Sequence, residues 1–261
     1  MRFDRSLQDA WTKDGRTWTS ELPSGWMQGR SIFGGLSTAI AAGLANRLVG
    51  PPWCLRTFTV QFLRPLVPGA VSSTFRSLRE GKSVRFSQVE LLQAGESALV
   101  VNTTHVRPRG DRTAVLAPSR TFEKPATALA DLPYAEGIVP EFTQRVAMRW
   151  ASGGYPFMGA SDARFSGYCR FREAAADVEG MVGLLDVWPC PSLSVLKKPA
   201  FASSVSWTAH ILKVPEPFPE WFGFEYETVA GDGGFHTAVG RLYGDDGELI
   251  GWTEQLVVVF A

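Results

Sequence analysis

WTAHILKVPEP, residues 207–217, repeats a stretch from the first half of the chain, TFTVQFLRPLVPG, residues 57–69. The two stretches align with Thr59 on Thr208 and with Arg64 on Lys213, a separation of 149 positions in both cases. The register continues beyond them, because Glu96 and Glu248 are 152 positions apart in matching surroundings. A separation kept over this length predicts that the chain contains two copies of one structural unit.

Each copy would have roughly 110 to 130 residues, a normal size for a domain. RPRGDRTAVLAPSR, residues 107–120, is polar, contains glycine and proline, and falls between the copies. The sequence therefore predicts an N-terminal unit over residues 1–108, a linker over 109–142 and a C-terminal unit over 143–261.

Within each copy the pattern is mostly that of β-strands around one helix. Residues 57–62 alternate polar and apolar side chains, and residues 239–243 do the same, as half-buried strands do. FGGLSTAIAAGLANRL, residues 33–48, has leucine or isoleucine at every fourth position and predicts a helix that stops at Gly50-Pro51. VEGMVGLLDVW, residues 178–188, predicts a shorter helix in the second copy.

The composition excludes some classes of function. The chain has 261 residues with 26 basic and 26 acidic side chains, so it has no net charge to attract nucleic acid or an anionic membrane. No apolar run approaches the ~20 residues of a membrane span, and residues 1–4 do not begin a leader segment. We therefore expect a cytoplasmic protein whose three cysteines, Cys54, Cys169 and Cys190, are reduced core thiols.

Five short motifs carry a resemblance to a known family. They span nearly the whole chain: IFGGL at 32–36, FLRP at 62–65, LLD at 184–186, SSVSWTAHI at 203–211 and LIGWTEQ at 249–255. In order and spacing they resemble the acyl-CoA thioesterase II family. This resemblance implies an α+β double hotdog fold, in which two tandem units each wrap an antiparallel sheet around a central helix.

The resemblance also implies an activity, the hydrolysis of acyl-CoA without metal or cofactor, and a set of site residues. It places the family's aspartate at Asp186, its glutamine at Gln255 and its threonine at Ser204. Ser206, two residues on, would share the strand face of Ser204 and is a second candidate for this hydroxyl or for contact with substrate. Leu36 and Thr59 depart from the residues that relatives carry, which indicates a divergent member.

These side chains suit activation of water for attack on a thioester. Asp186 lies between leucine and Val187-Trp188, and apolar surroundings raise the pKa of a carboxyl and make it a better general base. The backbone N–H groups of Gly34 and Gly35, at a helix start, are candidate contacts for substrate, and either these groups or those just after Asp186 are candidate donors to the oxyanion. Arg64 and Lys197-Lys198 are candidates for binding the phosphates of CoA.

Several alternatives stay open at this level. Asp186 can be a helix cap, Gln255 a solvent-facing strand residue, Gly34-Gly35 a packing contact and Arg64 plain surface charge. A hydratase or dehydratase of the same fold would pair an acid with His210, and a non-catalytic acyl-CoA-binding protein would need no reactive group.

The histidines lack metal spacing and no GxSxG elbow is present, which disfavours a metal site and a covalent serine hydrolase. Unpaired sheet edges predict a homo-oligomer.

Overall fold

The computed structural model describes residues 11–14, 17–109, 119–173 and 177–260. Residues 1–10, where we expected no leader segment, and residues 110–118 of the predicted linker lie outside the described residues. Among the described residues, no helix is long and apolar enough to cross a membrane.

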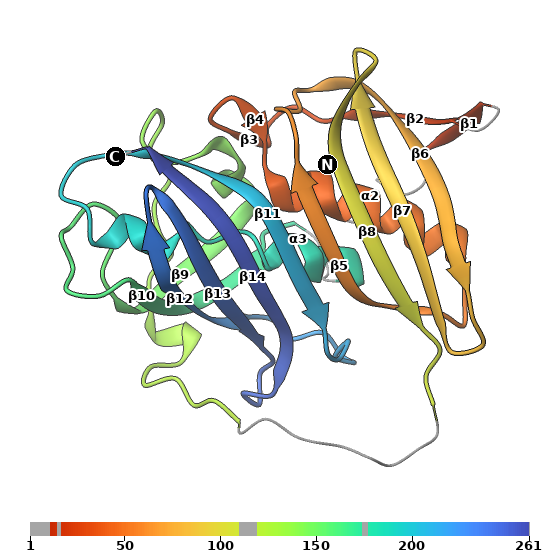
Figure 1. Cartoon of the computed structure of the whole chain (residues 1–261). Helices are drawn as coiled ribbons and strands as arrows, with labels where there is room; N and C mark the ends of the chain where they lie inside the picture. The colour runs from red at the N-terminus through yellow and green to blue at the C-terminus, as the bar shows by residue number, and fades with distance from the viewer. Residues whose placement is uncertain (1–10, 15–16, 110–118, 174–176, 261) are drawn as a thin grey trace.

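One antiparallel sheet of 12 strands runs through both halves of the chain (Figure 1). From its outer edge to the centre, the first half contributes β1 (Thr12–Asp14), β2 (Thr17–Leu22), β6 (Gly69–Glu80), β7 (Val84–Gln93), β8 (Glu96–Val106) and β5 (Cys54–Phe62). The second half continues with β11 (Phe201–Ile211), β14 (Leu249–Phe260), β13 (Phe235–Tyr243), β12 (Phe222–Asp232), β10 (Arg164–Phe171) and β9 (Val146–Gly153). A separate small hairpin joins β3 (Met27–Gln28) to β4 (Ser31–Ile32).

In the described residues, two α-helices, α2 (Gly34–Val49) and α3 (Val178–Leu184), lie against the same face of this sheet (Figure 1). The first matches the predicted helix to within one residue and ends at Gly50, as expected. The second ends four residues before Trp188, so the prediction of a helix through residue 188 is wrong at its end. Short 3₁₀ turns complete the chain: η1 (Ala126–Ala128), η2 (Glu141–Arg145) and η3 (Pro191–Ser194). This is the two-unit α+β architecture that the resemblance implied.

The two halves join at β5 and β11, whose central residues are equivalent to each other in the repeat. Thr59 pairs with Thr208, and their hydroxyl oxygens lie 3.2 Å apart. Both strands are also interrupted by a bulge at matching places, between Leu55 and Thr57 and between Ser204 and Ser206. The duplication seen in the sequence is therefore a local twofold relation in the structure.

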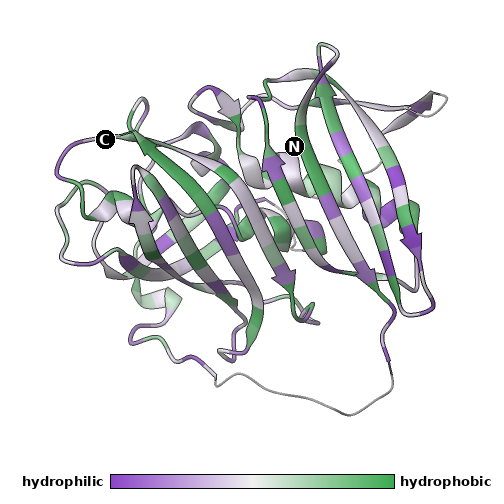
Figure 2. Ribbon diagram, in the orientation of Figure 1, coloured by the Kyte–Doolittle hydropathy of each residue, from purple (hydrophilic) through white to green (hydrophobic). Residues whose placement is uncertain are grey.

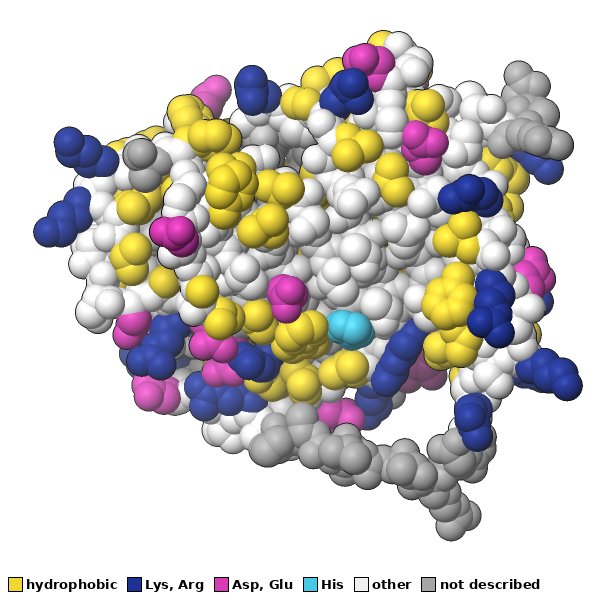
Figure 3. All heavy atoms as spheres, viewed as in Figure 1, with side chains coloured by type: hydrophobic (Ala, Val, Ile, Leu, Met, Phe, Trp, Pro, Cys, Tyr) yellow, Lys and Arg dark blue, Asp and Glu magenta, His cyan; other side chains and the backbone are white. Residues whose placement is uncertain are grey.

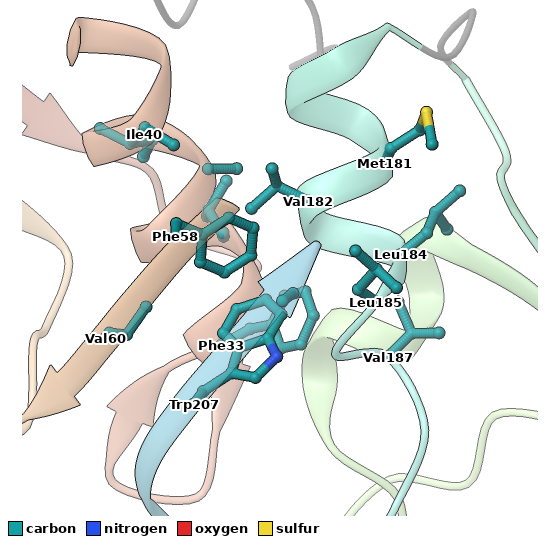
Figure 4. Packing of buried hydrophobic residues seen from close by; sticks show 14 of the residues in the cluster. Phe33, Ile40, Phe58, Val60, Met181, Val182, Leu184, Leu185, Val187 and Trp207 are labelled. Atoms are coloured by element: carbon teal, nitrogen blue, oxygen red, sulfur yellow. The ribbon is translucent and has the colours of Figure 1, made fainter. Parts of the chain in front are cut away.

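The core fills the space between the sheet and the helices. Along the strands, hydrophobic and hydrophilic residues alternate, and the hydrophobic set faces α2 and α3 (Figure 2). Figure 4 shows Phe33, Phe58 and Trp207 between the two helices, with Phe58 and Trp207 meeting edge to face at 4.8 Å between ring centroids. Cys169 and Cys190 are buried free thiols, whereas Cys54 is exposed, so the expectation that all three lie in the core is wrong for Cys54.

Candidate active site

Asp186 lies where α3 ends. Leu185 caps the helix, and the Asp186 N–H donates to the Gly183 carbonyl at 3.1 Å, closing a last tight turn. The chain then leaves the helix axis, because Val187 and Trp188 turn into the core and are 2% and 5% exposed. This turn directs the carboxyl group of Asp186 toward the middle of the molecule.

Gln255 joins Asp186 to Ser204. Its Nε2 donates to Asp186 Oδ1 at 2.6 Å, and its Oε1 accepts from Ser204 Oγ at 2.8 Å. The amide therefore has one consistent orientation, since a carboxylate only accepts and a hydroxyl can donate. The structure thus brings together the three residues that the resemblance selected, from α3, β11 and β14.

The first half contributes the N-terminus of α2 to the same place. A Cβ atom at Gly34 would lie 2.9 Å from Asp186 Oδ2, and one at Gly35 would lie 2.8 Å from the Gly183 carbonyl oxygen. Any larger residue would push α2 away from the end of α3. The two glycines therefore have a packing role. Because they have no side chain, the start of α2 can lie beside the carboxyl group of Asp186.

Burial raises the pKa of Asp186 from its usual 3.8 to about 7, although hydrogen bonds from Gln255 and from the backbone N–H of Gly35 act in the opposite direction. The loss of hydration is the larger effect, because burial disfavours the charged form of a carboxyl group. The partial positive charge at the start of the 16-residue helix α2 favours the ionised form. The result is a carboxyl group that exchanges its proton near neutral pH.

The other polar residues in the middle of β14 have separate roles. Thr253 is fully buried, and its hydroxyl oxygen accepts a hydrogen bond from the indole of Trp207. Glu254 lies on the opposite, exposed face of the sheet. Of these three residues, only Gln255 belongs to the chain of hydrogen bonds that reaches Asp186. Thr253 therefore has a structural role, and Gln255 contributes to the candidate site.

Family models match the two halves of the chain separately. The N-terminal domain of acyl-CoA thioesterases matches residues 22–107, and the C-terminal domain matches residues 122–259. The chain belongs to the acyl-CoA thioesterase family. It is accordingly a thioesterase, and no curated protein matches it in sequence.

Solved structures share the fold of this thioesterase over its whole length. A hot dog fold protein of unknown function from Alicyclobacillus acidocaldarius is 19% identical, with a TM-score of 0.87 and 99% of each chain covered. A putative thioesterase II from Thermobifida fusca is also 19% identical, with a TM-score of 0.85 and coverage of 98% of this chain and 97% of the other. An acyl-CoA thioesterase II from Mycobacterium marinum is 13% identical, with a TM-score of 0.77 and 98% of each chain covered. The predicted double hotdog fold is confirmed.

Ser206 does not share the strand face of Ser204 in the thioesterase, so that prediction is wrong. The bulge at Val205 shifts the register, and Ser206 pairs with Leu256 and Gln61 on the outer face of the sheet. A bulged residue reverses the alternation of side chains beyond it. Ser204 is thus the hydroxyl that reaches Gln255.

The same bulge separates His210 from the site. His210 lies on the outer face with Ser206, and its Nδ1 is 3.0 Å from Thr57 Oγ1. The acid–base pairing of His210 with Asp186 that a hydratase would need is therefore not formed in this chain.

Arg64 is held by its own half of the thioesterase. Its guanidinium lies 3.4 Å from Glu96 and donates to the Ser97 carbonyl at 2.9 Å. Lys213 and Glu248 form the matching pair in the second half. This repetition favours a structural role for Arg64, and its contact with CoA stays a prediction, as does that of the exposed Lys197-Lys198.

Sequence reasoning missed two buried residues beside the site, Trp207 and Tyr226. Trp207 fixes Thr253, the neighbour of Gln255 on the inner face of β14. Tyr226 lies in FGFEYETV, residues 222–229, where it and Thr228 are the hydroxyl-bearing members of the alternation that starts with Phe222 and Phe224. Hydroxyl groups on a strand face that begins as apolar are the signal that could have singled it out.

Proposed function

We propose that this thioesterase hydrolyses acyl-CoA to a free acid and CoA by direct attack of a water molecule that Asp186 activates. The observation that carries the proposal is the hydrogen-bonded chain Ser204–Gln255–Asp186, which ends in a buried carboxyl group with a pKa of about 7. A general base is most effective when its pKa is close to the working pH.

Ser204 and Gln255 support the orientation of the water. Ser204 donates its only proton to Gln255, so the lone pairs of its oxygen remain able to accept from water. Gln255 uses one Nε2 proton on Asp186 and keeps the other for water or the substrate carbonyl oxygen. When the protein holds the water molecule in the direction of attack, the entropy lost on orienting that water no longer contributes to the reaction barrier.

The reaction then has a balanced course. The water oxygen bonds to the thioester carbonyl carbon as its proton passes to Asp186, and negative charge develops on the carbonyl oxygen. The N-terminus of α2, at Gly34-Gly35, supplies partial positive charge for that oxygen. When the carbon–sulfur bond breaks, Asp186 returns its proton to the thiolate, and the acid and CoA leave.

Release of CoA thiol from a panel of short, medium, long and aromatic acyl-CoAs tests the proposal. The native protein should turn over at least one class, and Asp186→Asn should lower kcat/KM by about 10³-fold, within the usual range for removal of a general base. Asp162→Asn removes an exposed carboxylate that pairs with Arg164 and serves as the matched control. Full activity in folded Asp186→Asn would refute the mechanism, and no thiol release from any substrate would leave the non-catalytic acyl-CoA-binding alternative in its place.

We also propose that the protein is a homo-oligomer. Hydrophobic side chains gather on the outer face of the sheet at the corner where β14 ends and β11 begins (Figure 3). Phe201 and Phe260 pair there and are 84% and 63% exposed. Light scattering after size exclusion should give a multiple of 28.6 kDa, and Phe201→Ser combined with Phe260→Ser should lower that mass. A monomeric native protein would contradict the proposal.

We also propose that the protein is cytoplasmic. Its three free thiols support this location, because the cysteines of secreted proteins are usually oxidised to disulfides. Fractionation of cells that express the chain is the direct test. Recovery in an exported fraction would contradict it.

A further inference from the structure

A second group of polar side chains lies on the inner face of the sheet in the second half. Ser192 Oγ is 2.8 Å from His236 Nδ1 and 2.8 Å from Thr228 Oγ1, and Cys190 Sγ is 3.5 Å from Ser192 Oγ. Cys190 and Ser192 belong to the segment that follows Asp186, while Thr228 and His236 lie on β12 and β13. We call these four residues the β12 cluster.

The strand register places the β12 cluster beside the hydrolytic residues. Gln255 pairs with Ala238, and Ala238 pairs with Thr228, so one small buried side chain separates them on the same face. Two strand spacings amount to about 10 Å. His236 likewise pairs with Val257, which pairs with Ser204 on its other side. The β12 cluster and the Ser204–Gln255 pair thus lie on one continuous face.

Tyr226 precedes Thr228 on this face and lacks a partner. Its side chain is 3% exposed, with the rings of Phe165 and Phe224 packed edge-on against it. Its phenol oxygen forms no hydrogen bond with any residue that the structure describes, whereas the phenols of Tyr168 and Tyr243 donate to Lys124 and Glu225. The phenol oxygen is also not fully enclosed, so a small part of it remains accessible.

The phenol of Tyr226 is a permanent donor close to the reaction centre. Burial raises its pKa well above the usual 10.0, and the charges of Cys190 and Asp186 act in the same direction. The charge of Asp186 is therefore felt at Tyr226, and the phenol keeps its proton over the whole range of ordinary assays. A buried donor without an acceptor is unfavourable, and a water molecule or an oxygen atom of a bound ligand can supply that acceptor.

We propose that Tyr226 is a specificity-determining residue, which donates a hydrogen bond to an oxygen atom carried on the acyl chain of the substrate. The substrate class is an acyl-CoA whose acyl chain bears a hydroxyl or oxo group, in preference to the unsubstituted chain of equal length. This proposal rests on the proposed function, because it takes the acyl-CoA substrate as given. Thr228, two residues farther along the same face, extends the polar surface beyond Tyr226.

The chemistry of the surroundings favours the acyl chain over the phosphates of CoA. The ring contacts of Tyr226 are made by the uncharged side chains of Phe165 and Phe224, and phosphates need the cationic side chains found on the surface. A neutral oxygen substituent, in contrast, is satisfied by one neutral donor. The β12 cluster thus provides a polar end to a surface that is otherwise suited to hydrocarbon.

Binding of thioether analogues, which cannot be hydrolysed, tests the inference separately from catalysis. Calorimetry compares S-hexyl-CoA with its 3-hydroxy and 6-hydroxy derivatives on the native protein, on Tyr226→Phe and on the control Tyr243→Phe. A single neutral hydrogen bond corresponds to a preference of about three- to tenfold. The native protein and Tyr243→Phe should show this preference for at least one hydroxylated analogue, and Tyr226→Phe should lose it while binding S-hexyl-CoA as before.

Three results would overturn the inference. The first is a native protein without any preference, which decides the matter even if Tyr226→Phe fails to fold. The second is a preference that survives in Tyr226→Phe, and the third is an equal weakening of all analogues by that variant, which would assign the phenol to the thioester itself. Hydroxyl preference without thiol release from the corresponding esters would instead refute the proposed hydrolysis and leave this inference standing.

Discussion

The two halves of the molecule share a frame and differ in their polar interiors. In the first half, the N–H groups of Leu63 and Arg64 both donate to Ala98; in the second, those of Leu212 and Lys213 both donate to Ile250. The ion pairs beside these bends are duplicated as well. These repeated contacts fix how each central strand leaves the sheet, and they hold in both copies.

The site positions are not repeated. By the same register, Gln255 corresponds to Thr103 and Ser204 to Leu55. Thr103 bonds Ser87 at 2.6 Å, both side chains being buried, and forms a closed pair with no carboxyl group. The comparison teaches that strand bends and bulges are repeated with the fold, whereas the hydrogen-bonded chain to Asp186, on which the proposed function rests, occurs in one half only.

Equivalent substitutions in the two halves should therefore differ most. Gln255→Leu should lower kcat/KM by about 10²-fold, because the water and the carboxyl group lose their common partner. Thr103→Val should leave kcat/KM within about twofold while lowering the free energy of unfolding by about 1 to 3 kcal/mol, since Ser87 loses its buried partner. Thiol release and urea unfolding check both, and equal losses of activity would show that the halves are not functionally distinct.

The pH dependence separates the halves next. If Asp186 is the proposed base, with a pKa of about 7, kcat/KM should rise with pH and level off above that value. Between pH 8 and 5.5 the expected change is about 30-fold for a single ionisation near neutrality. A half-maximum near pH 4 would contradict this role for Asp186.

The stability of the folded protein should change with pH in the direction opposite to that of kcat/KM. The folded pKa of Asp186 exceeds its unfolded value of 3.8, so the folded state binds the proton more tightly, and this contribution is lost as pH rises from about 4 to about 7. Native protein should thus lose about 2 to 3 kcal/mol relative to Asp186→Asn between pH 5 and pH 8. The variant is needed as reference because burial lowers the pKa of His105, in the first half, to about 4, and that contribution is lost as pH falls.

A smaller contrast lies within β11. Ser204→Ala should reduce kcat/KM by about tenfold, the effect of one lost positioning hydrogen bond, and Ser206→Ala should have no effect on it. Steady-state kinetics on folded variants decide between them. A larger loss for Ser206→Ala would mean that the outer face takes part in the reaction.

The smallest effect should come from the duplicated ion pairs. Arg64→Ala and Lys213→Ala each break an exposed pair, and such pairs contribute little to stability because water and salt screen their charges. Both variants should keep KM for acyl-CoA within about twofold if the pairs are structural. A rise in KM for Arg64→Ala alone would restore its predicted contact with the CoA phosphates.

The sequence was informative where a contact depends on neighbouring residues or on the repeat. The stop at Gly50 and the alternation of β5 follow from local patterns, and the presence of two copies follows from the repeat. The bulge at Val205 does not, because a bulge is defined by the partner strand, and missing it put Ser206 on the wrong face. The end of α3 was missed for a similar reason, since tertiary packing turns Val187 and Trp188 into the core.

The site residues themselves came from the resemblance, as composition and periodicity alone did not distinguish Gln255 from a surface residue. The bond of Trp207 to Thr253 and the unpartnered phenol of Tyr226 required the strand register of the second half. Residues whose importance lies in contacts across strands are therefore the ones that a single sequence hides.

The pairing of Thr59 with Thr208 has a consequence for how this chain can vary. If the two units were separate identical chains, each substitution would appear on both sides of that pair, and residues at the centre would always meet copies of themselves. Covalent linkage removes that constraint. Phe58 can therefore pack against Trp207, its equivalent in the repeat, and the start of α2 at Gly34 can lie beside Asp186 without a second copy of that contact. Once the two units are joined in one chain, a residue in one unit can change without its equivalent in the other. An asymmetric site can then arise in a fold whose two units are alike.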